Sequence, residues 1–299
     1  MMMPRITSVR VATDLSTHAE RAVQQAAWLA RDAGIEKGVL VHALGLGRFH
    51  AFRELFSGGD QLGEELEKNA RAELQQLAER IRGETGFGYE LEVHQSGPVD
   101  AVLDHADPGA LIVTGAKGYH AFGEIAMGST SERVVRGAQN PVLVARNNLA
   151  GGYRKVVVAV DFSAHARAAL QYAQALAPNA ELHLVHAYPE MPSSGESYAG
   201  ITPNDVKFYA REMEERSARE LDAMLAECDM ERDALASITM EHAYAPQLIR
   251  DSAAERGAEL VVMGKQGHSR FREWMVGSVT AHVLARTGAD VMIVRDRRA

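Results

Sequence analysis

The stretch "VTGAKGYHAFGEIAMGSTSERVV" at residues 113–135 returns without a gap as "VMGKQGHSRFREWMVGSVTAHVL" at residues 262–284. Both copies keep the spacing G-x-x-G-x9-G-S, in which three glycines and one serine coincide. The repeat extends upstream, where "VRVATDLSTHAERAV" from residue 9 matches "VVVAVDFSAHARAAL" from residue 156. The sequence therefore indicates a tandem duplication of one unit, and the paired glycines are the first candidates for a shared function.

The chain length agrees with two domains, because 299 residues is long for a single core. We predict one domain at 1–150 and a second at 151–299, with "NNLAGGY" at 147–153 as the linker. Each half alternates short Val/Ile/Leu runs with helical stretches, which predicts βαβ units around a parallel sheet. The runs are apolar throughout, as in strands covered on both faces. The expected fold class is α/β, with two tandem doubly wound, Rossmann-like domains of five parallel strands each.

Helix signals recur in both halves. Either Ser16 or Thr17 is expected to cap the first helix, with Glu20 completing a capping box from Thr17. Ser163 is expected to cap the corresponding helix of the second half. A second, long and charged helix is predicted near 60–82, and its equivalent is predicted near 203–226.

Composition excludes several classes of function. The formal net charge is −8, and the charges are spread evenly without a basic stripe, so nucleic acid is not expected as the main partner. No apolar run approaches the roughly 18 residues of a membrane span, and the first residues lack a signal-peptide core. We therefore expect no membrane association and a cytoplasmic location. The single cysteine, Cys228, supports neither a disulfide framework nor a thiolate metal site.

The glycine segment begins where a predicted strand ends, and ligands of open parallel sheets bind outside the carboxyl ends of the strands. Gly115 and Gly118 would let backbone amides approach a ligand, because they carry no Cβ. Gly128 then opens a helix, whose free N–H groups and macrodipole favour phosphate. Further hydroxyl donors are expected from Ser129, Thr130 and Ser131, and in the second copy from Ser278 and Thr280. The pattern predicts a phosphate cradle without a Walker lysine.

An aspartate ends the first strand of each copy, at the same edge of the predicted sheet. Asp14 and Asp161 can accept hydrogen bonds from ribose hydroxyls or an adenine amino group. The alternative is that each aspartate only caps the following helix. His42 and His186 recur in "LVHA" strands, where they are either hydrogen-bonded core residues or line a base. Four loop cations could touch phosphates but are interpreted as exposed charges: Lys117, Lys265, His268 and Arg270.

With these motifs the chain resembles tandem universal stress proteins (the UspA-like family). The resemblance covers almost the whole chain and implies two adenine-nucleotide-binding domains with strand order 3-2-1-4-5. It implies pairing through the fifth strands, hence an intramolecular pseudo-dimer, and it is also compatible with a homodimer. ATP is the implied cofactor, with Mg²⁺ or Mn²⁺ bound through its phosphates. The implied nucleotide-binding residues are Thr13, Asp14, Val41, Gly115, Gly118, Gly128, Ser129 and Thr130, and in the second half Val160, Asp161, Val185, Gly264, Gly267, Gly277, Ser278 and Val279.

The second copy departs from the family pattern at two places. It has "ADVMIVR" where the first copy has "NPVLVAR", so a proline before the fifth strand is missing and the pairing geometry is open to change. Val160 replaces Thr13, which removes one contact and suggests two sites of different affinity.

No nucleophile with an adjacent base can be named. We therefore expect a nucleotide-dependent stress-response or signalling protein rather than an efficient enzyme. A slow Mg-dependent ATPase and a nucleotide-free interaction scaffold are the alternatives.

Overall fold

The computed structural model describes residues 6–45, 59–116, 128–188, 202–267 and 276–296. The first half contains β1 (Ser8–Ala12), α1 (Thr17–Asp32), β2 (Lys37–Ala43), α3 (Gly59–Thr85), β3 (Glu90–His94), α4 (Pro98–Leu103), β4 (Ala110–Gly115), α5 (Ser129–Gly137) and β5 (Val142–Ala145). The second half contains β6 (Lys155–Ala159), α6 (Ala164–Leu176), β7 (Glu181–Tyr188), α7 (Pro203–Glu227), β8 (Ser237–His242), α8 (Ala245–Arg256), β9 (Leu260–Gly264), α9 (Ser278–Arg286) and β10 (Asp290–Val294). Within these residues, no helix is both long and apolar enough to cross a membrane.

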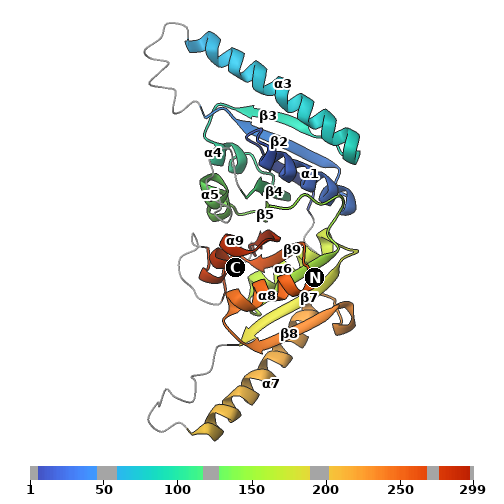
Figure 1. The fold of residues 1–299 in the computed structure, drawn as a ribbon, viewed down its shortest axis with the longest axis vertical. Helices are drawn as coiled ribbons and strands as arrows, with labels where there is room; N and C mark the ends of the chain where they lie inside the picture. The colour runs from blue at the N-terminus through green and yellow to red at the C-terminus, as the bar shows by residue number, and fades with distance from the viewer. Residues whose placement is uncertain (1–5, 46–58, 117–127, 189–201, 268–275, 297–299) are drawn as a thin grey trace.

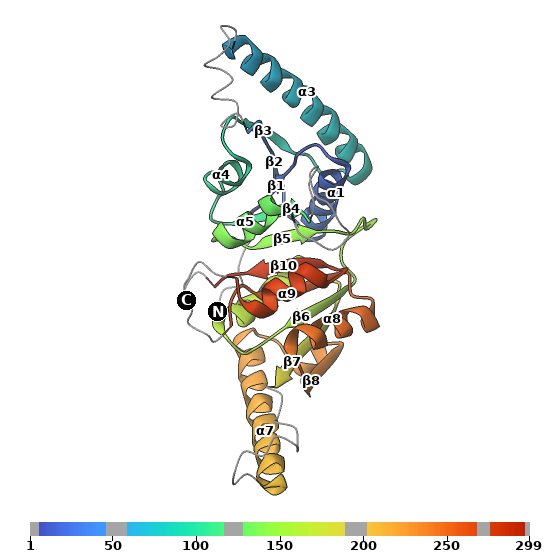
Figure 2. The same ribbon diagram turned by 60° about the vertical axis from the view of Figure 1, so that its left-hand side comes forward.

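All the strands form one sheet in the order β3-β2-β1-β4-β5-β10-β9-β6-β7-β8. Strands within each half are parallel, which confirms the predicted α/β class and the order 3-2-1-4-5 in both copies. The halves meet where β5 and β10 pair antiparallel, with Met292 opposite Leu143. Figure 2 shows these two strands side by side in the middle of the molecule, and Figure 1 shows α3 and α7 at its opposite ends. The expected pairing through the fifth strands is confirmed.

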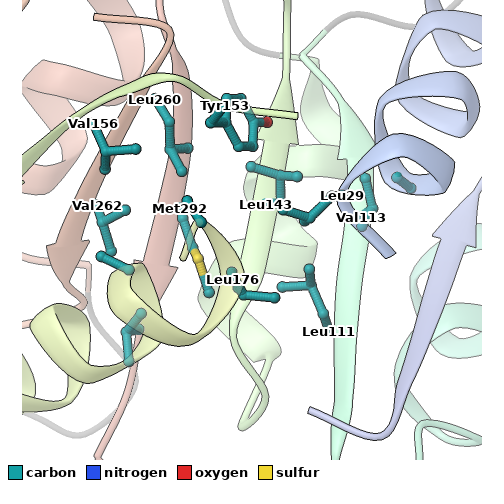
Figure 3. Close-up of a cluster of buried hydrophobic side chains, with 14 of the residues drawn as sticks. Leu29, Leu111, Val113, Leu143, Tyr153, Val156, Leu176, Leu260, Val262 and Met292 are labelled. Atoms are coloured by element: carbon teal, nitrogen blue, oxygen red, sulfur yellow. The ribbon is translucent and has the colours of Figure 1, made fainter. Parts of the chain in front are cut away.

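Helices cover both faces of the sheet because successive strand residues point to opposite sides. In β4, Leu111 and Val113 join one buried cluster while Ile112 joins the other. Helices α1, α3, α6 and α7 contribute to the first cluster, and α4, α5, α8 and α9 contribute to the second. Both clusters continue across the β5–β10 seam, and Figure 3 shows Leu143 of the first half near Met292 of the second. The two halves therefore share their hydrophobic layers.

Serine side chains cap the first helix of each half. Ser16 Oγ accepts from Ala19 N, and Ser163 Oγ accepts from Ala166 N, each at 3.2 Å. Of the two candidates in the first half, Ser16 is therefore the cap, and the capping box expected from Thr17 is wrong. Counted from Ser16, the third helical position is Ala19, which has no side-chain acceptor to complete a box.

Asp290, which stands where the first copy has the family proline, connects the linker to the sheet by hydrogen bonds. Asp290 is 0% exposed. Its carboxylate accepts from Arg146 N at 2.7 Å, from Asn147 N at 2.9 Å and from the Tyr153 hydroxyl at 2.7 Å. Its own N–H donates to Glu259 O at 3.0 Å, a bond that proline cannot make. Burial raises the pKa of this carboxyl. The pairing of the fifth strands is thus kept, and the missing proline is replaced by a buried polar anchor.

Gly264 and Gly277 of the repeated motif differ in whether the fold requires a glycine at that position. A Cβ on Gly264 would lie 2.8 Å from His165 Cβ and 3.1 Å from the His165 carbonyl carbon, so α6 packs on β9 only because this residue is glycine. Gly277 has φ −59° and ψ 152°, an extended conformation open to any residue. A Cβ there would meet nothing closer than Lys265 O at 3.5 Å. The fold therefore needs glycine at 264 but not at 277.

We predict that Asp290→Ala lowers the free energy of unfolding by about 3 kcal/mol, because it leaves the buried Tyr153 hydroxyl and two part-buried backbone N–H groups without an acceptor. Urea unfolding followed by circular dichroism measures this change. Asp251→Ala on the exposed face of α8 is the control and should change stability by less than about 0.5 kcal/mol. Equal stability of Asp290→Ala and the unchanged protein would contradict the anchoring role.

Gly264→Ala should destabilise the protein by about 1–3 kcal/mol, because the added methyl group overlaps the start of α6. Gly277→Ala should cause no loss of stability, since its backbone is already extended and a Cβ would meet its nearest neighbour, Lys265 O, at an ordinary contact distance of 3.5 Å. The two variants form a matched pair for thermal unfolding. A comparable drop in Tm for both would show that the fold also requires the glycine at 277.

Candidate functional site

Each first strand ends in a turn that an aspartate holds. Asp14 Oδ1 accepts from Ser16 N at 3.1 Å and from Ser16 Oγ at 2.5 Å, and Asp161 Oδ1 accepts from Ser163 N at 3.1 Å. The residue between aspartate and serine has φ 62° in both copies, at Leu15 and at Phe162. Side chains of this size rarely adopt the left-handed conformation, and such residues cluster at functional sites. One oxygen of each aspartate therefore orders the turn before the helix, but the helix caps are Ser16 and Ser163, so the aspartates are not the caps that the alternative expected.

The other oxygen of Asp161 lies against the glycine loop. A Cβ on Gly267 would be 2.4 Å from Asp161 Oδ2, so the carboxylate occupies the space that a side chain would fill. The structure thus brings the first-strand aspartate and the loop glycine together, as the sequence analysis expected of a shared site. The equivalent loop glycine, Gly118, lies outside the described residues, as do the loop cations Lys117, His268 and Arg270.

Backbone hydrogen bonds hold each helix start beside the end of the fourth strand. Gly128 N donates to Ala116 O at 2.8 Å, and Gly277 N donates to Lys265 O at 3.0 Å. Both glycines precede a helix of nine residues, α5 and α9. Each helix N-terminus therefore faces the same edge of the sheet as the first-strand aspartate of its half.

Two hydroxyls that were expected to bind phosphate bind the sheet instead. Ser131 Oγ donates to Gly115 O at 2.6 Å, and Thr280 Oγ1 donates to Gly264 O at 3.0 Å. Both residues are buried, because at the third helical position the side chain turns back toward the strand. Their role is to fix the helix start, and the expectation that they donate to a ligand is wrong.

Helices α5 and α9, whose N-termini are the candidate phosphate sites, have no side-chain cap, whereas α1 and α6 do. The N-cap residues are Gly128, with φ −65° and ψ 146°, and Gly277, and neither makes a side-chain cap hydrogen bond. The first amides of a helix have no intrahelical acceptor. Ser129 and Ser278 are exposed in the first turn, and Thr130 and Val279 follow them half-buried. The amides of these two turns are therefore placed for an external acceptor such as a phosphate oxygen.

A histidine of the second strand is hydrogen-bonded to the end of the first strand in each half. His42 Nδ1 lies 2.9 Å from Thr13 O, and His186 Nδ1 lies 2.8 Å from Val160 O. A carbonyl only accepts, so Nδ1 carries the proton and Nε2 is the acceptor when the ring is neutral. Burial lowers the pKa of His186, which keeps that ring neutral at pH 7. The prediction that these histidines are hydrogen-bonded is confirmed, although both rings are only half-buried.

Val41 and Val185 lie buried beneath this turn. Their carbonyls accept from Thr13 N and Val160 N, each at 2.9 Å. The Thr13 hydroxyl accepts from Leu15 N at 3.1 Å, and Val160 has no equivalent group. The presence of valine in place of threonine therefore removes a hydrogen bond from the turn itself, in addition to any contact with a ligand.

Aromatic rings distinguish the second site. Phe162 lies 4.4 Å from His186 between ring centroids, His186 lies 5.3 Å from Tyr188, and Tyr188 lies 4.8 Å from His242. The first copy has leucines at the positions of Phe162 and Tyr188. This row of rings was not predicted, although the leucine-to-aromatic changes are visible when the two copies are aligned residue by residue.

Lys265 does not fit its interpretation as an exposed loop charge. It is only 3% exposed, and its ammonium donates to Arg136 O at 2.6 Å and to Ala138 O at 3.1 Å in the other half of the chain. Burial, with the nearby Arg295 charge, lowers the pKa of this amine to about 8. The sequence could not indicate this position, because it depends on how the halves pair.

The described residues contain no group of three or more His, Cys, Asp or Glu side chains that could hold a metal ion. A metal at either site would therefore need ligands from a bound molecule or from the remaining residues. The starts of α5 and α9 have no side-chain cap, so the described residues fit the phosphates of the implied nucleotide better than a directly bound metal.

Comparisons with known proteins agree with this architecture. The model of the universal stress protein family matches residues 6–146 and 152–295. A universal stress protein of Mycolicibacterium smegmatis is 24% identical, over 97% of this chain and 97% of its own length. The universal stress protein Slr1230 of Synechocystis is 23% identical, over 96% of this chain and 99% of its own length.

Solved structures show the same fold. The crystal structure of a universal stress protein from Archaeoglobus fulgidus superposes with a TM-score of 0.67 and 21% identity, covering 97% of this chain and 98% of that one. The two family-model matches together span nearly the entire sequence, one on each copy of the repeat. This chain therefore belongs to the universal stress protein family, with two family domains in tandem.

Proposed function

We propose that the chain binds ATP at the carboxyl-end edge of each half and acts as a nucleotide-dependent stress-response or signalling protein. One observation carries the proposal. Helices α5 and α9 start at glycines without a side-chain cap, and the glycine at 277 is not required by the fold. An uncapped helix start beside the strand ends is suited to an anion.

The residues divide into three roles in this proposal. The phosphates meet the first-turn amides after Gly128 and Gly277, and the loop glycines let the chain approach them. Asp14 and Asp161 accept hydrogen bonds from the ribose or the adenine amino group. Val41, Val160 and Val185, with the polar Thr13, form the floor under the base, and the choice of adenine rests on the family resemblance. Mg²⁺ or Mn²⁺ is then bound through the phosphates, where it neutralises their charge.

The proposal also bears on assembly. The fifth strands pair within the chain, so the outer strands of the sheet are β3 and β8. A homodimer of this chain would therefore use a surface other than the fifth strands. We propose no nucleic-acid and no membrane partner.

Two other functions compete with the proposed one. In a slow ATPase the same site would also position a water molecule against the γ-phosphate. In a nucleotide-free scaffold the glycines would serve only as turns. The extended backbone of Gly277 argues against the scaffold, because a glycine kept only for a turn would have a positive φ.

We predict that the protein binds ATP with micromolar Kd or tighter, and that Gly128→Val with Gly277→Val abolishes binding while leaving the fold intact. Valine side chains would stand where phosphate and backbone approach. Isothermal titration calorimetry with ATP and with GTP measures binding, and circular dichroism checks the fold. Gly123→Arg is the control, since the second copy has Arg272 at that position of the motif.

Unaltered ATP binding by the double variant would show that the repeated glycines are not a phosphate site. A similar loss of affinity in Gly123→Arg would show that the whole loop is sensitive, without a special role for the helix starts. Absence of heat and of a thermal shift at saturating ATP would contradict the proposal itself.

Turnover of ATP should stay well below the roughly 1–10³ s⁻¹ of ordinary enzymes, because the sequence offers no nucleophile with an adjacent base that can be named. Release of inorganic phosphate at saturating Mg·ATP measures it. A steady rate within the enzyme range that disappears on changing one loop residue would favour the ATPase alternative.

A further inference from the structure

Lys265 connects the second glycine loop to the first half of the chain. It follows β9 directly and lies between Gly264 and Gly267. Its N–H donates to Val294 O at 2.7 Å, and its carbonyl accepts from Gly277 N at 3.0 Å. Both backbone groups of Lys265 are therefore fixed to elements of the second candidate site.

The side chain of Lys265 crosses the seam between the halves. Its ammonium donates to Arg136 O at 2.6 Å and to Ala138 O at 3.1 Å, which are carbonyls at the C-terminal end of α5. The last carbonyls of a helix lack intrahelical donors and carry the negative end of the macrodipole, so they stabilise a cation. This contact offsets the desolvation of a lysine that is only 3% exposed.

Helix α5 joins this contact to the first candidate site. Its C-terminal carbonyls bind Lys265, and its N-terminal residues, Gly128 and Ser129, form the proposed phosphate cradle of the first half. A nine-residue helix is rigid and spans roughly 14 Å. A displacement of the second glycine loop would therefore move one end of the helix whose other end binds phosphate in the first site.

The reverse connection is built differently. Ala116 stands in the first glycine loop at the position of Lys265, so this position of the first loop carries no amine. The C-terminal end of α9 is held instead by Arg146, which donates to Leu284 O and follows β5 outside the glycine loop. Arg295, the counterpart of Arg146, is the charged group that faces Lys265. Among the residues that the structure describes, the loop-to-helix contact is thus seen from the second loop to α5 and not from the first loop to α9.

We propose that Lys265 is a positioning residue that couples the two nucleotide sites by holding helix α5 from the second glycine loop. The inference rests on the proposed nucleotide binding and adds to it a regulation of the first site by the second. Coupling between binding sites is reciprocal, so each occupied site changes the affinity of the other by the same factor. The link depends on a single ammonium group.

The binding test places Lys265→Met in a Gly277→Val background, where the second site is closed and only the first binds ATP. Removing the ammonium releases the end of α5, so the Kd of the first site should rise about fivefold or more. Methionine keeps the length and the apolar stem of lysine, and Lys265→Arg, which retains a donor and a charge, should restore part of the affinity. Lys155→Met, which removes an exposed lysine of the same half, should leave the Kd unchanged.

A second measurement needs no nucleotide. Hydrogen–deuterium exchange of the full chain should show faster exchange of the α5 amides, residues 129–137, in Lys265→Met than in the unchanged protein. The α9 amides, which Arg146 holds, should exchange at similar rates in both proteins. This comparison separates positioning of one helix from a general loss of stability, which would speed exchange in both.

The outcomes distinguish the inference from the proposed function. If Gly277→Val binds ATP and Lys265→Met leaves its Kd unchanged, the coupling is overturned even if the variant has a lower Tm. If Gly277→Val binds no ATP, the proposed function of the first site fails and the coupling fails with it. Unchanged exchange in α5 would overturn the positioning role in either case.

Discussion

The antiparallel pairing of β5 with β10 is the interaction on which the rest of the structure depends. It turns two parallel sheets into one and lets the hydrophobic layers run through both halves. Because the halves run in opposite directions, the carboxyl ends of one half lie beside the amino ends of the other. Lys265 can therefore reach the end of α5 from a loop in the other half, and Asp290 can bind the linker that follows β5.

Fusion of the two copies explains why these contacts are unequal. In a symmetric pair of identical domains, every substitution at the seam occurs twice and must suit both sides. In one chain, Asp290 replaces Pro141 and Lys265 replaces Ala116 on one side only. Each substitution then makes a contact that its counterpart lacks, and the row of rings at Phe162 and Tyr188 makes the second site differ from the first.

The α/β class could be predicted from the sequence because it depends on local patterns, namely the apolar strands and the repeat, whereas the strand order followed from the family resemblance. The spaced glycines and the first-strand aspartates also indicated the edge where Asp161 meets Gly267. Side-chain directions could not be predicted in the same way. Ser131 turns back toward Gly115, and Lys265 is buried across the seam, because packing against distant residues decides both. The glycine at 277 is extended, so the local pattern did not reveal why a glycine stands there.

A crystal structure of the protein with ATP and Mg²⁺ tests the central claim most directly, since it locates the phosphates. The account predicts phosphate oxygens within hydrogen-bond distance of the main-chain N–H groups that follow Gly128 and Gly277, with the ribose or base near Asp14 and Asp161. ATP bound away from both helix starts, or bound with its phosphates directed into solvent at both, would contradict it.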